Sequence, residues 1–544
     1  MSERNYWEPL LKRGETLTLT EDLMIPEFAM YLKDLEPSEK EQLFSRMSLE
    51  GRSDKDRFML FTDVLLEFVG SGEWKNRSPA FLAMCAKASF LRGKYGYNQI
   101  LARGSSNLAS RGYAAAAYCR QSLDPRWLNN LRNITNQAWQ AEEYIVFAEL
   151  AGQLASVLID LGYTDHATDI ATESIDKVTI VSAKDQEIRT MVQAALLRAR
   201  IVLAYAASKS ISREEALIRL DSAEDTAKHL DHVLALTDIS FNRARILLEL
   251  YEYDKARAIL DHVIRKYDSM GYLQGVADAR NVEGVMLLNM GQLQEARDTF
   301  EELLVIQQRL NNQIGLAGTL INVGEIDRTL GQIDQMETYN RRALEISQEA
   351  EYMRGIAIAT ANLGDVELRK GNTVAATEMY EKAIDLVDGA GMKKLLVLTL
   401  FLAGDANFLT GKYDDAINIY RRAREVSAEI GYPLAAFNAD VSELMTKWAM
   451  EEDPEAELTK TVKEIVGPAN RWLESIDSTP MREVRQTVYD DPSIESDLCV
   501  FFDGERNFEC RVERKALSKD CFGNLFWMGS LCPYFKEFLA RFYG

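Results

Sequence analysis

Two series of glycines recur at every fortieth position in the second half of the chain. They are Gly284, Gly324, Gly364 and Gly404, and Gly291, Gly331, Gly371 and Gly411. A fixed period of this length is typical of one supersecondary unit that is repeated and stacked on its neighbours. We therefore expect a solenoid, whose core runs along the stack, and a binding surface rather than the core of a globular enzyme.

Two further positions recur within each unit. Further along each unit than the first glycine stands a small or flexible residue: Ala296, Met336, Ala376 or Ala416. One helical turn later stands a larger residue: Phe300, Asn340, Tyr380 or Tyr420, respectively. The apolar residues follow helical spacing, and the second glycine would end one helix and begin the turn into the next. We expect the small residues to let two antiparallel helices approach closely, and the aromatic residue to fill the gap to the neighbouring unit.

This spacing of small and aromatic residues resembles the tetratricopeptide repeat. The 40-residue length is similar to the long-helix variety found in kinesin light chains, LGN-type adaptors and bacterial sensors of the MalT type. The resemblance implies an all-α, right-handed superhelix, a solenoid of antiparallel helix pairs. The register continues backwards through Ala244 and Ala256, and through Ala204 and Ala216, which gives about seven units between roughly 140 and 430.

The resemblance also implies a face for a ligand, because the first helix of each unit lines the groove of a tetratricopeptide superhelix. In kinesin light chain and LGN-type repeats, groove asparagines clamp an extended peptide, and residues 322–325 and 362–365 resemble their Asn-Leu-Gly stretch. Val282 and Leu402 depart from that pattern. The residues expected on this face are Asn242, Arg245, Asn281, Asn322, Glu325, Arg328, Asn362, Asp365, Arg369 and Asp405. A solvated helix face with local ion pairs would give the same pattern.

From this resemblance we expect a protein-interaction scaffold that binds an extended peptide or a helix of a partner protein. The alternative is a regulatory module of the MalT-sensor type that senses a small molecule or a peptide. No HExxH, GxSxG, GxGxxG or Walker-type motif occurs in the chain. We therefore expect no catalytic residues and no enzyme activity.

The net charge of −21 disfavours general nucleic-acid binding. Between Trp74 and Ala141, however, the sequence contains ten basic residues and a single acidic residue, which gives this segment a net charge of +9. The candidates for contact with an anion or an acidic partner are Lys94, Arg103, Arg111 and Arg120. This basic segment lacks the Lys-Ser/Thr ending of a phosphate-binding loop. Docking of the segment onto the acidic remainder of the same chain is the other interpretation.

Four cysteines, Cys499, Cys510, Cys521 and Cys532, recur at every eleventh position near the C-terminus. A hairpin loop centred on Gly504-Glu505 would place Cys499 opposite Cys510. The four thiols could bind zinc, undergo redox or disulfide chemistry, or be buried and free, and the usual CxxC pairs are missing. Redox or metal-dependent activity here is the third functional hypothesis. We expect Cys85 and Cys119, in apolar helical surroundings, to lie in the core.

We predict five segments: an N-terminal helical cap at 1–73, a basic helical segment at 74–139, repeats at 140–430, capping helices at 431–476, and a small cysteine- and aromatic-rich α+β module at 477–544. No apolar stretch follows the polar start, and the longest apolar run, around 395–403, is far too short to span a bilayer. Six cysteines in a chain without an export signal favour a reducing compartment. We therefore expect a cytoplasmic protein with no membrane span and no cofactor, other than zinc if the four cysteines bind it.

Overall fold

The computed structural model divides into two compact units, each described here by itself. The first comprises residues 1–249, 253–283 and 302–314, and the second comprises 250–252, 284–301 and 315–544. The structure describes residues 28, 31–32, 34–49, 57–122, 125–160, 163–182, 186–210, 213–249, 252–389, 392–430, 433–450, 502–503 and 509–510.

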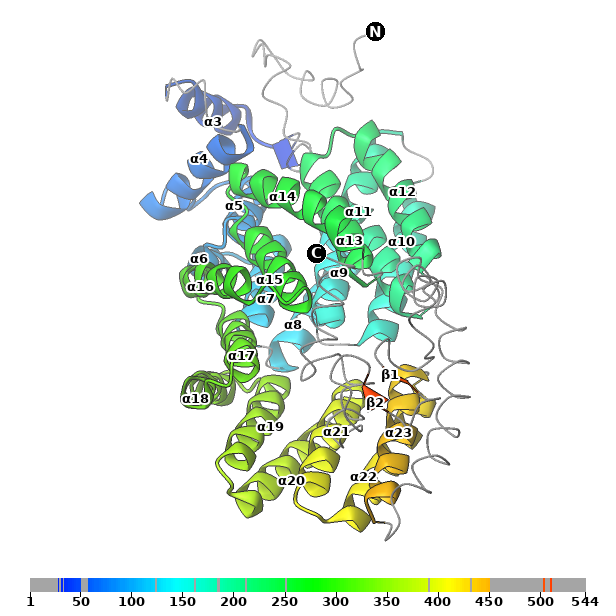
Figure 1. The fold of residues 1–544 in the computed structure, drawn as a ribbon. Helices are drawn as coiled ribbons and strands as arrows, with labels where there is room; N and C mark the ends of the chain where they lie inside the picture. Colours follow the sequence, from blue (N-terminus) through cyan, green and yellow to red (C-terminus); the bar gives the residue numbers. More distant parts are fainter. Residues whose placement is uncertain are drawn as a thin grey trace. The chain divides into compact units, whose positions relative to one another are not determined.

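The described residues are almost entirely helical (Figure 1). The helices before the regular repeats are α3 (Pro37–Leu49), α4 (Arg57–Ser71), α5 (Pro79–Leu91), α6 (Tyr95–Gly104), α7 (Leu108–Ser122), α8 (Pro125–Gln140), α9 (Tyr144–Asp160), α10 (Thr164–Ser182), α11 (Gln186–Ser210) and α12 (Arg213–His229). The next are α13 (Val233–Glu249), α14 (Tyr253–Ser269), α15 (Leu273–Asn289), α16 (Leu293–Leu310), α17 (Gln313–Thr329), α18 (Ile333–Glu349), α19 (Met353–Arg369), α20 (Thr373–Gly389), α21 (Lys393–Leu409), α22 (Tyr413–Glu429) and α23 (Pro433–Met450).

From α13 onward the helices begin at evenly spaced positions, at 233, 253, 273 and so on, so two helices make one repeat of the predicted length. Consecutive helices pack against each other from α3 to α14 and from α18 to α23, and Figure 1 shows α19 to α22 as a row of antiparallel helices. We call the odd-numbered helices from α9 to α23 first helices and the even-numbered ones second helices. The predicted all-α stack of antiparallel helix pairs is confirmed for the described residues.

The first glycine of each repeat lies where its two helices come closest. A Cβ added at Gly284 would stand 2.6 Å from the ring of Phe300, and one at Gly404 would stand 2.5 Å from the ring of Tyr420. The aromatic ring therefore packs against the glycine of its own repeat. The rings of Tyr380 and Tyr420 also belong to a core cluster that extends into the following helices.

Earlier repeats use a different pair of residues at the same two positions. Ala204 and Ala244 replace the glycine, and Leu220 and Leu260 replace the aromatic residue, all with no exposed surface. A larger residue on the first helix is thus matched by a smaller one on the second. The sum of the two volumes changes little, which keeps the helices at a similar separation.

The repeats turn at both ends through residues with left-handed backbone conformation. Within repeats these are the glycines of the second series, with φ between +72° and +85°. Between repeats the corresponding residues recur with the same period, and they are Asp231, Gly271, Asn311 and Glu351. Their φ angles of 50–63° place them in the region that ends helices. The described turns therefore share this left-handed residue, although the second set has no constant residue type.

Within the first unit, the chain returns to touch itself after about four helix pairs. The Tyr95 hydroxyl lies 3.2 Å from Oε1 of Gln274, and a Cβ at Gly271 would stand 2.7 Å from Nε of Arg92. At the same contact, a Cβ at Gly93 would stand 2.3 Å from Leu310. The corner between α5 and α6 therefore packs closely against the corners that follow α14 and α16.

A buried charge network joins the N-terminal helices to this unit. Lys87 forms an ion pair with Glu149, whose other carboxylate oxygen accepts hydrogen bonds from Tyr31 at 2.6 Å and Tyr113 at 2.8 Å. All four residues are buried. The carboxylate is compensated by one cation and two hydroxyl donors, as a charge in a protein interior requires. The buried free thiols of Cys85 and Cys119 confirm their predicted place in the core.

Two other segments bear on the sequence predictions. In α11 the stretch Arg189–Ser208 is long and apolar enough to cross a membrane by length and composition, but 72% of it is buried inside the protein. Near the C-terminus, β1 (Phe502–Asp503) pairs antiparallel with β2 (Glu509–Cys510), and Cys510 lies opposite Phe502. The predicted pairing of Cys499 with Cys510 is therefore wrong. Beyond these two strands, the predicted cysteine module lies outside the described residues.

The packing of Gly404 predicts a stability ranking for glycine-to-alanine changes. We expect Gly404→Ala to destabilise the protein by about 1–3 kcal/mol, because the added methyl group overlaps the Tyr420 ring. Gly364→Ala should cost less, since its Cβ would stand 3.1 Å from Tyr380. The control is Gly318→Ala in α17, where no atom lies within 4 Å, and it should stabilise by up to about 1 kcal/mol. Urea unfolding of the three variants checks this order, and equal effects would contradict it.

The environment of Asp278 predicts a pH dependence of stability. Burial raises the pKa of its carboxyl group to about 6, and Asp160 adds to this, against the opposing effects of Arg120, Arg245 and the hydrogen bond from Gln274. The folded protein therefore binds this proton more tightly than the unfolded chain does. The stability that comes from this group is present at low pH, falls as the pH rises from about 4 to about 6, and is constant above.

We expect Asp278→Asn to remove this dependence. Between pH 4.5 and 7.5, the unfolding free energy of the variant should rise relative to that of the wild type by about 1 kcal/mol, a value reduced for partial exposure. Asp261→Asn, at an exposed position on α14, serves as the control and should show no such change. Thermal unfolding at several pH values measures the difference, and a constant difference for Asp278→Asn would rule out the raised pKa.

Candidate partner-binding face

The first helices form a continuous face in each unit. In the second unit α19 contacts α21, and α21 contacts α23, in addition to their contacts with the second helices between them. Because the repeat length is constant, side chains one repeat apart occupy equivalent places on this face. The predicted groove residues from Asn322 to Asp405 lie on α17, α19 and α21, whereas Asn242, Arg245 and Asn281 lie in the first unit.

Three carboxylates in the second unit stand at one register position of this face. They are Glu325, Asp365 and Asp405, each half-buried. Glu325 accepts two hydrogen bonds from Nε of Arg328, at 2.9 and 3.0 Å, and Asp365 accepts one from Nε of Arg369 at 2.9 Å. The first two carboxylates are therefore each neutralised by an arginine from the following turn of their own helix.

Asp405 differs from the other two. Its Oδ1 accepts a hydrogen bond from the Tyr420 hydroxyl at 2.6 Å. Burial raises the pKa of Asp405 to about 7, Asp365 adds to the rise, and the hydrogen bond from Tyr420 opposes it. Burial of the ring and the contact with Asp405 raise the pKa of Tyr420. The structure thus holds a carboxylate that costs free energy to ionise in the same register as two that are paired with arginines.

The asparagines of the face are used within the protein. Asn242 donates to the backbone carbonyl of Asp238 in its own helix at 2.8 Å, and Asn362 donates to Oδ1 of Asn340 at 2.9 Å. Asn340 stands at the aromatic position of its repeat and in turn donates to the carbonyl of Met336 at 2.9 Å. The amide of Asn362 therefore joins two helices, whereas that of Asn242 bonds within its own helix. Asn322 is half-buried at the same register position, and Asn281 is half-buried one position before it, where Val282 holds that place.

Sequence reasoning missed a second charged register in the first unit, formed by Arg198, Asp238 and Asp278. Nη2 of Arg198 lies 3.2 Å from Oδ2 of Asp238, whose Oδ1 accepts a hydrogen bond from Tyr267 at 2.7 Å. Asp278 accepts a hydrogen bond from Gln274 at 2.8 Å. The three residues lie one repeat apart on α11, α13 and α15, and this spacing is visible in the sequence.

The structure places the predicted groove residue Arg245 against an aromatic ring. Its guanidinium group stacks 3.7 Å from the ring centroid of Tyr205, which lies one repeat earlier on α11. The ring of Phe241 lies on the same side of α13, 5.6 Å from the guanidinium carbon. Arg245 thus contributes to the packing of the first unit, and aromatic rings attract the charge that it carries.

The four basic candidates of the segment 74–141 do not form one site. Lys94 and Arg103 are exposed at the two ends of α6, and Arg111 donates to Gln137 at 3.3 Å. Arg120 lies further along α7, about 13 Å from Arg111 by helix rise. It is surrounded by Asp160, Asp278 and the ring of Phe90, and its Nε is buried without a hydrogen-bond partner among the described residues.

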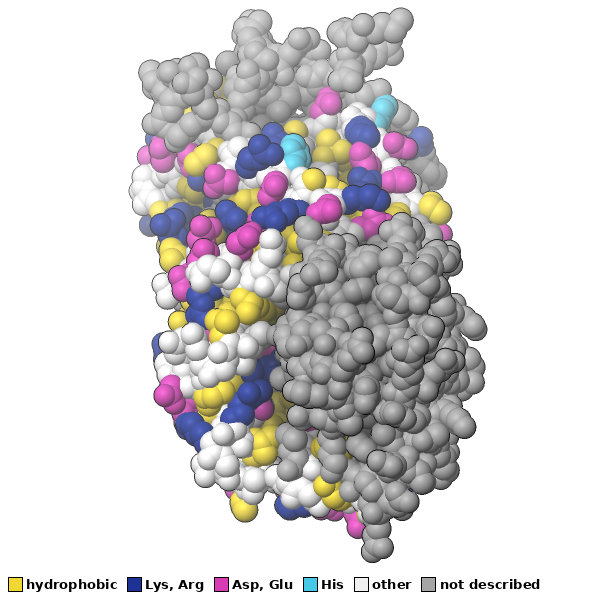
Figure 2. All heavy atoms as spheres, in the orientation of Figure 1, with side chains coloured by type: hydrophobic (Ala, Val, Ile, Leu, Met, Phe, Trp, Pro, Cys, Tyr) yellow, Lys and Arg dark blue, Asp and Glu magenta, His cyan; other side chains and the backbone are white. Residues whose placement is uncertain are grey.

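Other basic residues of the segment also face inward. Arg92 forms an ion pair with Asp63 at 2.6 Å and donates to the Thr62 hydroxyl at 2.7 Å. Together with Lys87 and Arg120, it shows that part of the +9 excess is compensated inside the first unit. On the face shown in Figure 2, acidic and basic side chains are interspersed among the described residues.

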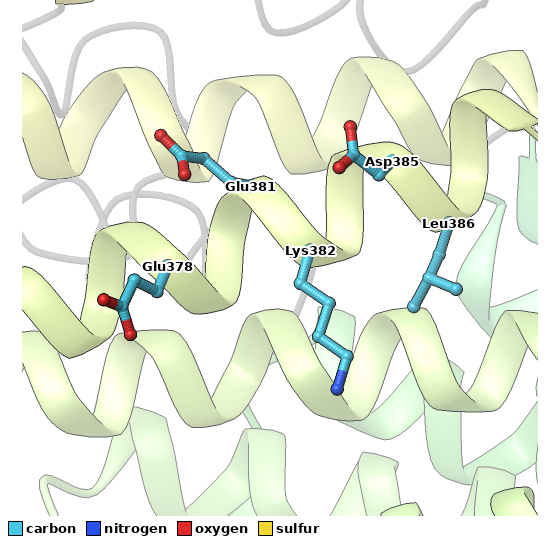
Figure 3. A pocket seen from close by; sticks show the side chains of 5 residues that line it. All are labelled: Glu378, Glu381, Lys382, Asp385 and Leu386. Carbon is cyan, nitrogen blue, oxygen red and sulfur yellow. The ribbon is translucent and has the colours of Figure 1, made fainter.

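The described part of the chain offers no metal site, because no three His, Cys, Asp or Glu side chains in it converge. Cys499, Cys521 and Cys532 lie outside the described residues, and Cys510 is described only by its strand. A shallow cavity of about 460 Å³ lies on α20. Figure 3 shows that its lining, Glu378, Glu381, Lys382, Asp385 and Leu386, comes from this second helix alone. It therefore lies apart from the first-helix register.

Comparison with known families finds the tetratricopeptide repeat at residues 315–389 and 355–429, which span α17 to α22. Comparison with the curated protein sequences finds no match. Among solved structures, a Rap protein complexed with Competence and Sporulation Factor is 15% identical, with a TM-score of 0.44 over 62% of this chain and 93% of that one.

Two other solved structures give similar values. A signal-transduction ATPase with a tetratricopeptide repeat sensor, from Pyrococcus horikoshii, is 13% identical over 88% of this chain and 74% of that one, with a TM-score of 0.42. Aspartyl phosphate phosphatase F from Bacillus subtilis is 14% identical over 62% and 90%, with a TM-score of 0.40. The match identifies tetratricopeptide repeats across α17 to α22, and the helices from α13 to α23 begin with the same spacing. Such repeats are the architecture of a protein-interaction or sensing module.

Proposed function

We propose that the chain is a non-catalytic scaffold that binds an extended peptide segment of a partner protein on its first-helix face. The observation that carries this proposal is the charged register of Glu325, Asp365 and Asp405, which lies within the matched repeats. Ligand binding by stacked repeats uses such surfaces, because equivalent side chains recur at fixed intervals along them.

The spacing of this register suits a peptide better than a small molecule. A small-molecule site usually encloses its ligand in an apolar pocket with a few polar groups. The register is instead a row of half-buried charges carried by three successive first helices. An extended chain presents side chains and backbone groups along its length, so it can contact several repeats at once.

The hydrogen bonds of the asparagines within the protein restrict how a peptide can bind to this face. Because Asn362 donates to Asn340, and Asn242 to its own helix, these amides do not offer those donors to a peptide backbone. The proposal therefore assigns recognition to the charged pairs of the register. A guanidinium group held by a carboxylate, as in Arg328 with Glu325, keeps further donors for a ligand carbonyl or carboxylate.

A pair of matched variants tests this proposal. The pair Glu325–Arg328 lies on α17, and the pair Arg342–Glu345 lies on α18 of the same repeat with the same three-residue spacing. We expect Arg328→Ala with Glu325→Ala to weaken partner capture at least about tenfold, because each charged hydrogen bond that is lost costs over about 1 kcal/mol. Affinity purification from lysate, followed by titration of the captured partner as a synthetic peptide, measures this loss.

The control removes the second-helix pair by Arg342→Ala with Glu345→Ala. Both side chains are about 60% exposed, so their loss should change stability by less than about 0.5 kcal/mol and leave binding intact. Equal loss of binding in both double variants would place the contact elsewhere. Binding of a metabolite rather than a peptide by the purified wild type would favour the sensor hypothesis instead.

A further inference from the structure

One carboxylate of the charged register lacks the arginine that its counterparts have. Arg328 stands three positions after Glu325, and Arg369 stands four positions after Asp365. The equivalent positions after Asp405 hold Phe408 and Leu409. Arg369 is the last residue of α19, and Leu409 is the last residue of α21. At the sequence position equivalent to Arg369, α21 therefore carries a leucine.

No cation among the described residues replaces that arginine. The groups that act on the carboxyl of Asp405 are the hydroxyl of Tyr420, which donates to Oδ1, and the carboxylate of Asp365 one repeat earlier. Burial is the largest effect on its pKa, which is raised to about 7. A half-buried carboxylate without a counter-charge is a costly arrangement, and a bound cation would remove this cost.

The surroundings of Asp405 suit an organic cation with an apolar stem. Leu402 and Phe408 stand three positions before and after it on the same side of α21, and both are partly exposed while packing against the core. The ring of Phe408 lies 5.7 Å from that of Tyr413. Lysine and arginine side chains bury their methylene groups along apolar surface while their charged ends reach a carboxylate, and aromatic rings attract them further.

We propose that Asp405 binds a lysine or arginine side chain of the partner peptide, with Leu402 and Phe408 against the stem of that side chain. This inference rests on the proposed function, because it assumes that a peptide lies along the first helices. The basic side chain takes the place that Arg328 and Arg369 occupy in the two preceding repeats. A metal ion is a poorer occupant, since the described residues near it supply one carboxylate and no cluster of ligands.

The test uses the full chain, immobilised, and pools of short peptides with random flanking positions. One position is fixed in each pool as arginine, lysine or citrulline, which has the shape of arginine without its charge. Mass spectrometry of the retained peptides gives the ratio of arginine to citrulline at each fixed position. We expect arginine and lysine pools to be retained about tenfold better than citrulline at one position, the effect of one charged hydrogen-bonded contact.

Three variants connect this preference to Asp405. Asp405→Asn should abolish it, because the neutral amide keeps an acceptor for Tyr420 but has no charge. Leu409→Arg should also abolish it, because it restores the spacing of Asp365 and Arg369 and supplies the cation from within. Leu409→Gln, of similar length but uncharged, should retain it. Circular dichroism of each variant establishes that the helices are intact.

The outcomes separate this inference from the proposed function. The inference about Asp405 would be overturned if peptides were retained without preference for a basic residue, or if the preference survived Asp405→Asn. Either result would still agree with the proposed scaffold function. Retention of no pool by the folded wild type would overturn both. Zero-length carbodiimide crosslinking of the unliganded protein adds a second readout. A crosslink from Asp405 to a lysine of the same chain would show that the chain itself occupies the site, and would overturn binding of a partner.

Discussion

The packing of two facing residues, one on each helix of a repeat, is the constraint on which the rest of this structure depends. Gly284 faces Phe300 and Gly404 faces Tyr420, whereas Ala204 and Ala244 occur in the repeats that carry leucine at the facing position. In these repeats the smaller residue on one helix is matched by a larger one on the other, and both lie between the two antiparallel helices. Because interiors are packed as densely as organic crystals, neither residue can change in size alone without cost.

A constant helix separation has a consequence for function. The described turns end in a left-handed residue, and the helices from α13 to α23 begin at evenly spaced positions. Side chains one repeat apart are then equivalent, which is why Glu325, Asp365 and Asp405 can be compared as members of one series. Asp405 is recognised as different, because it lacks a following arginine, only by comparison with the other two. The packing of the core therefore determines where the side chains of the first-helix face lie.

Local spacing in the sequence predicts one part of the fold and misses another. The glycines and the residues that follow them identify the helix pairs, because a close helix approach needs a small side chain and a turn needs a residue that adopts positive φ. The turns at Asp231, Asn311 and Glu351 cannot be recognised from a constant residue in the sequence, since three different residue types adopt the same positive-φ conformation there. Features that depend on partners are harder still. An asparagine on the first-helix face looks available to a ligand, yet Asn362 is bonded to Asn340 on another helix.

The basic segment shows most clearly how charge counted along a chain differs from charge on a surface. Its excess of +9 suggests an external anion, but Lys87 is paired with Glu149 and Arg92 with Asp63, and Arg120 faces Asp160 and Asp278. Asp278 lies on α15, far along the chain from Arg120 on α7. Such contacts arise because the stack in the first unit returns on itself, bringing basic early helices beside acidic later ones. The positive segment thereby helps to hold that unit together, and its buried charges are unavailable to phosphate.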